Sequence, residues 1–128
     1  MSKTNVGSES EGAPLRRLLI VQHNEFAASS MRRFLAASFD EVRVVNASSG
    51  VFDVLREFAP THLVCGQELG TDSETGATLI PSWRAECPSL ICVVLATGAL
   101  QLPSRLPGVD AVVHKPATPS AWLSVLAA

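Results

Sequence analysis

Charge and long apolar runs are both scarce in this sequence. Only 17% of its 128 residues are charged, the formal net charge is -2, and the longest basic runs are the pairs Arg16-Arg17 and Arg32-Arg33. Because nucleic-acid binding depends on neutralising phosphates with clustered Lys and Arg, we do not expect it here. The longest apolar stretch, residues 90–102, is well short of the ~20 residues that a membrane-spanning helix needs. The sequence therefore predicts neither a nucleic-acid partner nor a membrane span.

Core-forming side chains are almost absent from the first 14 residues, which read M-S-K-T-N-V-G-S-E-S-E-G-A-P. This composition predicts a disordered tail over residues 1–14. The segment also lacks the apolar centre of a secretory signal, so we expect a cytoplasmic location. Residues 15–128 have the length of a single domain, and 47% of the chain is hydrophobic, which is enough for a packed core.

Motifs of common catalytic and metal sites are missing as well. The three cysteines, Cys65, Cys87 and Cys92, form no C-x-x-C pair, which argues against a disulfide framework and against a zinc site. The chain has no G-x-S-x-G elbow, no G-x-G-x-x-G loop and no phosphate-binding loop that ends in Gly-Lys-Ser/Thr. We therefore expect no catalytic residues of these classes and no metal ligands.

Five short apolar runs are present, and they alternate with segments of helical periodicity. The runs are typical of strands that are covered on both faces. Strands that alternate with helices predict an α/β domain with a doubly wound, five-stranded parallel sheet. The expected strands are 18–21, 42–45, 63–66, 90–96 and 111–113, and the expected helices are 25–38, 51–58, 77–86 and a last one capped by Thr118.

Three prolines limit the expected helices. Pro81 should be tolerated only in the first turn of the helix over 77–86, because proline lacks the N–H that later turns require. Pro103 and Pro107 interrupt residues 98–108, which leaves room for at most one or two helical turns between the fourth and fifth strands. The sequence therefore predicts that the fourth helix of the alternating pattern is shortened or missing.

Polar residues follow the expected strands at their carboxyl ends. In an open parallel sheet, ligands bind at these ends, near the point where the strand order reverses. The candidates are Gln22 and His23 after the first strand, Gln67 and Glu68 after the third, Thr97 after the fourth, and Lys115 and Pro116 after the fifth.

Four segments at these strand ends resemble the receiver domain of two-component response regulators in order and spacing. They are L-L-I-V-Q-H-N-E, H-L-V-C-G-Q-E-L, V-V-L-A-T-G and G-V-D-A-V-V-H-K-P, of which the last is the most specific. The resemblance runs from about residue 15 to the end of the chain and implies a flavodoxin-like sheet of order 2-1-3-4-5. For active members it also implies a phosphorylatable aspartate after strand three and an acidic pair after strand one that holds Mg²⁺. A hydroxyl residue after strand four and a lysine followed by a cis proline after strand five complete the implied site.

This chain matches part of the implied site but has no acidic residue at the three positions where the family has one. Three residues match the implied hydroxyl residue, lysine and cis proline, namely Thr97, Lys115 and Pro116. The acidic pair falls on Gln22 and His23, and the phospho-acceptor falls on Gln67. An amide cannot replace a carboxylate nucleophile, and Mg²⁺ is usually bound through carboxylates. We therefore expect a degenerate pseudo-receiver that is not phosphorylated on aspartate, binds no Mg²⁺, is not an enzyme, and works as a protein–protein interaction module.

Two alternatives stay open. If the alignment shifts by one residue, Glu68 or Glu25 becomes a substitute carboxylate, and the chain is then a phosphorylatable receiver in a phosphorelay. A small ligand in the vacated pocket would instead make it a sensor. Lys115 is expected to pair with Glu68 or Asp72 and to close the pocket. The expected partner is a signalling protein that binds the first and last helices or residues 98–108, and the sequence is also compatible with a homodimer.

Overall fold

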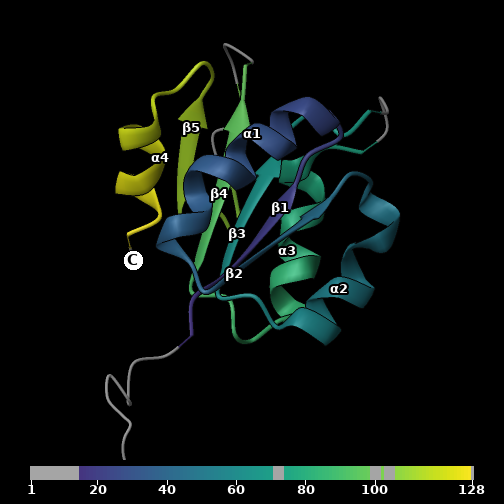
Figure 1. Ribbon diagram of the computed structural model, residues 1–128. Helices are drawn as coiled ribbons and strands as arrows, with labels where there is room; N and C mark the ends of the chain where they lie inside the picture. The colour runs from purple at the N-terminus through teal and green to yellow at the C-terminus, as the bar shows by residue number, and fades with distance from the viewer. Residues whose placement is uncertain (1–14, 71–73, 99–101, 103–105, 128) are drawn as a thin grey trace, which may run out of the picture.

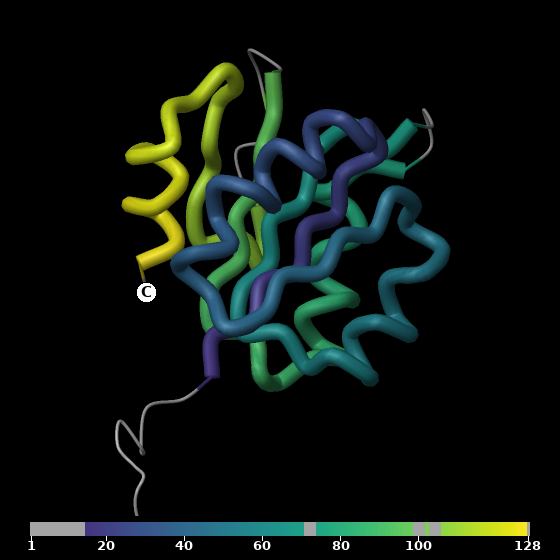
Figure 2. Tube along the Cα trace, viewed as in Figure 1, coloured from purple at the N-terminus to yellow at the C-terminus, as the bar shows by residue number. Residues whose placement is uncertain are grey.

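A computed structural model describes residues 15–70, 74–98, 102 and 106–127, and it contains one five-stranded parallel sheet. The strand order is β2-β1-β3-β4-β5, and helices lie on both faces of the sheet (Figure 1 and Figure 2). The predicted doubly wound architecture is thus confirmed. The strands are β1 (Arg17–Val21), β2 (Glu41–Val45), β3 (His62–Gly66), β4 (Cys92–Thr97) and β5 (Ala111–His114). The helices are α1 (Glu25–Leu35), α2 (Val51–Phe58), α3 (Gly76–Glu86) and α4 (Pro119–Val125), with short 3₁₀ helices at Ala36–Ser38 and Ser48–Gly50.

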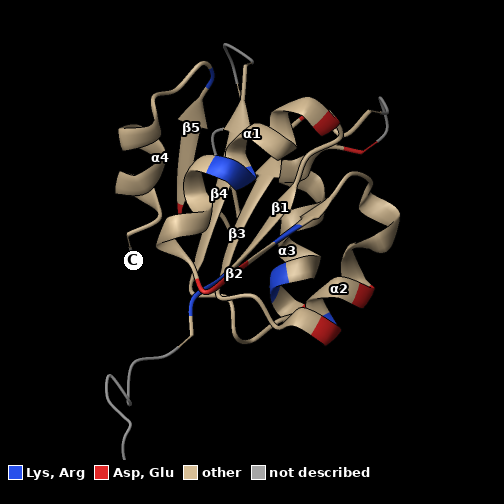
Figure 3. Ribbon diagram, viewed as in Figure 1, with Lys and Arg blue, Asp and Glu red and all other residues tan. Residues whose placement is uncertain are grey.

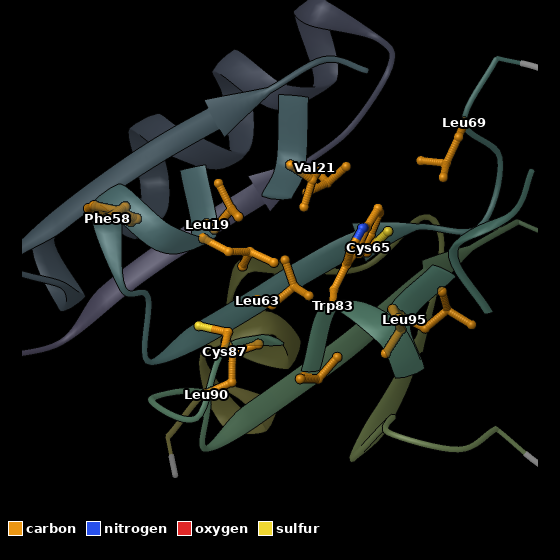
Figure 4. Packing of buried hydrophobic residues seen from close by; sticks show 14 residues of the cluster. Leu19, Val21, Phe58, Leu63, Cys65, Leu69, Trp83, Cys87, Leu90 and Leu95 are labelled. Atoms are coloured by element: carbon orange, nitrogen blue, oxygen red, sulfur yellow. The ribbon is translucent and has the colours of Figure 1, made fainter. Parts of the chain in front are cut away.

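Buried side chains form one apolar layer on each face of the sheet. Successive strand residues point to opposite faces, so Leu18 and Ile20 pack with α1 and α4, while Leu19 and Val21 pack with α2 and α3. Trp83 of α3 belongs to the second layer, which Figure 4 shows, and only 1% of its surface is exposed. Because both faces are covered, the inner strands are almost continuous apolar runs, which made them visible in the sequence.

α3 begins where two backbone segments approach closely. A Cβ at position 76 would lie 2.5 Å from the carbonyl oxygen of Gly66, so only glycine fits there. Thr75 caps the helix, because its side chain accepts the amide of Thr78. The helix continues through Pro81, which lies beyond its first turn. The prediction that this proline is tolerated only in the first turn was wrong; the helix bears the loss of the one N–H donor that proline lacks.

The connection between β4 and β5 is not helical at its described residues, 98, 102 and 106–110. Three of its apolar side chains pack on the layer that α2 and α3 form, namely Leu102, Leu106 and Val109. Arg84 of α3 fastens the connection, since its Nη1 donates to the carbonyl oxygen of Gly108 (2.9 Å) and to Oδ2 of Asp110 (2.7 Å). Loop side chains and one arginine therefore cover the sheet where the sequence predicted a shortened or missing helix.

All three cysteines are buried free thiols. Burial raises the pKa of the Cys65 thiol to about 12. Burial, and to a smaller extent the charge of Asp110, also raises the pKa of Cys92. The thiols of Cys65 and Cys92 are therefore protonated at neutral pH and behave as small apolar side chains.

Charge is spread over several elements, and Figure 3 shows acidic and basic residues on the same face of the molecule. No helix among the described residues combines the length and the apolarity needed to span a bilayer. The predicted tail at residues 1–14 and the proposed Lys115 partner Asp72 lie outside the described residues.

Candidate functional site

The carboxyl ends of the strands lie at the upper end of the sheet in Figure 1. Val21 of β1 lies beside Cys65 of β3, and Gly66 of β3 lies beside Ala96 of β4. The chain therefore leaves β1, β3 and β4 at the same edge of the sheet. This edge holds Gln22, His23, Glu68 and Thr97.

Gln22 is a buried polar residue that is fixed by its neighbours. Only 4% of its surface is exposed. Its side-chain Oε1 accepts the amide of Asn24 (3.2 Å), and its carbonyl oxygen accepts Nδ2 of Asn46 (3.0 Å). Asn24 in turn caps α1, because its Oδ1 accepts the amide of Ala27 (2.9 Å). Gln22 is thus part of the structure that joins β1 to α1.

The β3 residue that faces Gln22 is Gly66. A Cβ at this glycine would lie 3.4 Å from Nε2 of Gln22. Gln67, the residue that the sequence suggested for this place, points elsewhere: its Oε1 accepts the amide of Ala77 (2.9 Å) and its carbonyl oxygen accepts the amide of Gly76 (3.0 Å). Gln67 therefore holds the start of α3. A shift of one residue along a strand turns the side chain to the other face, which explains the difference.

Glu68 supplies a carboxylate at this edge of the sheet. Its Oε2 accepts the hydroxyl of Thr97 (3.3 Å), and Thr97 has no exposed surface. The carbonyl oxygen of Glu68 lies 2.9 Å from Nδ1 of His23. Because a carbonyl oxygen can only accept, this nitrogen of His23 carries the hydrogen. Glu68 thus connects the loop after β3 to the ends of β1 and β4, whereas Glu25, the other substitute considered, lies exposed in the first turn of α1.

Lys115 and Pro116 belong to a neighbouring groove, which we call the α1 groove. The peptide bond between them is cis, as the resemblance implied. The groove has a volume of about 510 Å³. Its lining residues are Gln22, Phe26, Ala27, Ser30, Met31, Lys115, Pro116, Ala117 and Trp122.

The α1 groove has an apolar wall and a single basic residue at its rim. Phe26, in the first turn of α1, is 79% exposed. Lys115 takes part in none of the five ion pairs among the described residues, so its expected pairing with Glu68 does not form in this structure. Phe26 was not among the candidate site residues predicted from the sequence. An aromatic residue outside the buried face of an expected helix could have indicated a binding surface.

No group of three or more His, Cys, Asp or Glu side chains gathers for a metal ion within the part of the chain that the structure describes. His62 lies at the other end of β3, has no exposed surface and packs edge-on against Phe39 at 5.0 Å between ring centroids. Its Nδ1 is 2.7 Å from the Thr61 hydroxyl. His62 therefore has a place in the core, away from the site.

Fold and site together define a flavodoxin-like α/β domain whose polar residues collect at the carboxyl ends of its strands. Among solved structures, the signal receiver domain of an HD domain-containing protein from Pseudomonas fluorescens Pf-5 matches with a TM-score of 0.78 and 16% identity, over 89% of this chain and 93% of that chain. A CheY-like response regulator receiver domain protein from Methanospirillum hungatei JF-1 matches with a TM-score of 0.76 and 22% identity, over 87% of this chain and 90% of that chain.

A third match is a response regulator protein from Burkholderia pseudomallei, whose structure contains a phosphorylated aspartic acid, a calcium ion and citrate. Its TM-score is 0.76 at 20% identity, and the match covers 87% of this chain and 66% of that one. No protein-family model and no curated protein matches the chain. The chain thus has the fold of response regulator receiver domains.

Proposed function

We propose that the chain is a receiver-like signalling domain that is not phosphorylated on aspartate and that acts by binding a protein partner. The observation that carries this proposal is the residue of β3 that faces Gln22, because that residue is Gly66 and has no side chain. Gln67, one position later, is bonded to the start of α3. A phosphoryl group needs a nucleophilic acceptor, and neither residue offers a carboxylate.

The requirement for Mg²⁺ fails at the same place. Phosphoryl-transfer sites bind this ion through one or two carboxylates, whereas β1 is followed by Gln22 and His23. An amide and an imidazole supply no negative charge to offset that of a divalent cation. In this proposal the domain binds no Mg²⁺, catalyses no reaction, binds no nucleic acid and works in the cytoplasm. Because the Gln22 side chain lies beside Gly66, we do not propose a small ligand in that space.

Treatment with acetyl phosphate and Mg²⁺, followed by intact mass spectrometry, tests the proposal. We expect no phosphoryl adduct on the full chain. We also expect that beryllofluoride with Mg²⁺ leaves the melting temperature unchanged, because Gln22, His23 and Gly66 supply no carboxylate to hold the metal. A stoichiometric adduct, or a Mg²⁺-dependent rise in melting temperature, would overturn the proposal.

A second function is favoured by one observation. The Oε2 atom of Glu68 lies 3.3 Å from the buried hydroxyl of Thr97, so one carboxylate does reach this edge of the sheet. Phosphorylation of Glu68 would make the chain a member of a phosphorelay. An adduct on the wild type that is lost in Glu68→Gln would establish this function, while an adduct kept in Glu68→Gln would point to another acceptor.

We place the partner in the α1 groove. A phenylalanine that is 79% exposed beside an apolar groove is the kind of surface that protein interfaces cover. Lys115 lines the same groove and has no ion-pair partner among the described residues, so it favours a carboxylate on the other side. These features fit an amphipathic helix with a bulky apolar side chain and a nearby Asp or Glu.

Matched alanine variants test this surface with a partner identified by photo-crosslinking from Ser30, another residue of the groove. We expect Phe26→Ala to weaken binding by roughly 30-fold, the effect of losing about 2 kcal/mol at an interface anchor. Ile91→Ala is the control, because Ile91 is 57% exposed and precedes β4 at the opposite end of the sheet. Equal binding by wild type and Phe26→Ala would contradict this placement.

A further inference from the structure

A second hollow lies at the amino-terminal end of the sheet, and the proposed function does not use it. It has a volume of about 390 Å³, within the roughly 300–1,000 Å³ of small-molecule sites. It lies where the start of β1, the 3₁₀ helix after α1 and the end of α4 meet. Its lining residues are Arg16, Ser38, Phe39, Leu123, Leu126 and Ala127, and we call it the Arg16 hollow.

Arg16 has an unusual set of contacts. Its Nη2 donates to the carbonyl oxygen of Leu126 (2.9 Å), and its guanidinium carbon lies 4.8 Å from the centre of the Phe39 ring. Its Nε is shielded from water and has no hydrogen-bond partner among the described residues. A buried donor without an acceptor is costly, because it has given up water and gained nothing in return.

The charge of Arg16 is also only partly compensated. None of the five ion pairs among the described residues includes it. Asp40 is close in space, but its Oδ2 accepts the main-chain amide of Arg16 (2.6 Å) and forms no ion pair with the guanidinium. A carbonyl oxygen and an aromatic ring therefore surround a partly buried cation, and a carboxylate is the group that a guanidinium binds best.

The rest of the hollow is mainly apolar. Phe39 and Leu126 are buried, whereas Leu123 is 38% exposed at the rim. Ser38 adds a single hydroxyl group. Leu15, 52% exposed, directly precedes Arg16 and extends the apolar surface at this end of the sheet. One cation within an apolar wall matches a ligand that has one negative group and an apolar body.

We propose that the Arg16 hollow binds a small amphipathic carboxylate, with the carboxylate on the guanidinium of Arg16 and the apolar chain against Phe39 and Leu123. Apolar burial and a charge-assisted hydrogen bond each contribute to such binding. The site lies at the opposite end of the sheet from Gly66 and the α1 groove, so it does not depend on the function proposed for them.

Octanoate, octanol and acetate separate the two contributions, since octanol lacks the charge and acetate lacks the chain. We expect calorimetry on the full chain to show saturable binding of octanoate, and NMR to show amide shifts at Ser38, Phe39 and Leu123. Octanol and acetate should bind at least about tenfold more weakly, the size of effect that one charged hydrogen bond or a buried alkyl chain accounts for. Octanol binding as tightly as octanoate would overturn the proposal, as would the absence of saturable binding.

Variants then assign the site. Arg16→Gln should weaken octanoate binding by at least about tenfold, since it removes the cation. Arg32→Gln, which removes an exposed arginine from α1, is the matched control and should bind as the wild type does. Because Arg16 also packs on Phe39, Leu123→Ala provides a second variant at the exposed rim, and it too should weaken binding. Unchanged affinity in Leu123→Ala, or in a folded Arg16→Gln, would contradict the assignment.

Discussion

Gln22 and Gly66 are a matched pair of residues, one long and one without a side chain. The amide nitrogen of Gln22 lies 3.4 Å from the place where a Cβ on residue 66 would be. A Cβ introduced at position 66 would therefore touch the Gln22 side chain at an ordinary van der Waals distance. An acid at position 66 alone would still face Gln22 and His23, which supply no carboxylate for a metal ion.

The first prediction concerns the combined change Gln22→Asp, His23→Asp and Gly66→Asp. Shortening Gln22 makes room for the new side chain, and three carboxylates at the ends of β1 and β3 supply the hard anionic oxygens that Mg²⁺ binds. We expect this variant to gain saturable Mg²⁺ binding, seen as a rise in melting temperature. At a Mg²⁺ concentration about 100 times the dissociation constant, the gain in unfolding free energy is about 2.7 kcal/mol.

The triple variant with Asn at the same three positions is the control. Asn has nearly the same size as Asp but carries no charge, and we expect no response to Mg²⁺. In EDTA the Asp variant should be less stable than the Asn variant, because three neighbouring carboxylates repel one another. An equal response of both variants to Mg²⁺ would show that the missing acids are not what prevents metal binding.

Among the elements, the end of the connection between β4 and β5 carries a carboxylate, Asp110, that bonds to two neighbouring elements. Oδ2 of Asp110 accepts the main-chain amide of Val93 (2.8 Å) and Nη1 of Arg84 (2.7 Å). One oxygen thus joins the start of β4, α3 and the residue before β5.

The second prediction is that Asp110→Ala lowers the free energy of unfolding by about 1–3 kcal/mol, the cost of leaving a hydrogen-bonded group in the core without its partner. Chemical denaturation measures the change. Asp110→Asn keeps an acceptor oxygen for Val93 and should lose less. Asp53→Ala is the control, because Asp53 forms only an exposed pair with Arg56 in α2 and should cost about 0.5 kcal/mol or less. Equal losses in Asp53→Ala and Asp110→Ala would refute the bridging role.

The strands were predictable from the sequence, whereas the side chain facing the site and the α1 groove were not. The inner strands were predictable because burial on both faces makes them continuous apolar runs. The residue facing the site was predicted one position late, as Gln67 in place of Gly66, because an apolar run shows where a strand lies but not which face its last residues take. The α1 groove needs the loop after β5 to lie against α1, and such a contact between distant segments has no local sequence signal.

At the scale of the whole molecule, burial in the two apolar layers affects how the free energy of unfolding depends on pH above neutrality. Cys65 belongs to the layer beneath α2 and α3 and has no exposed surface. Burial raises the pKa of its thiol from 9.0 to about 12, because the thiolate would lie among apolar side chains. In the unfolded chain the same thiol ionises near its ordinary pKa, since water then reaches it.

The third prediction follows from that difference. Between pH 9 and about 12 the unfolded state loses a proton that the native state keeps, so the free energy of unfolding falls as the pH rises through this range. The contribution of Cys65 is fully present below pH 9 and declines by at most about 1.4 kcal/mol per pH unit. The chain contains no tyrosine, and its lysines are Lys3 and Lys115. Because burial also raises the pKa of Cys92, the comparison with Cys65→Ala is what isolates the contribution of Cys65. Denaturation curves across this range should be less dependent on pH in Cys65→Ala than in the wild type. Equal dependence in the two proteins would mean that the native thiol ionises as freely as the unfolded one, and that water reaches this layer of the core.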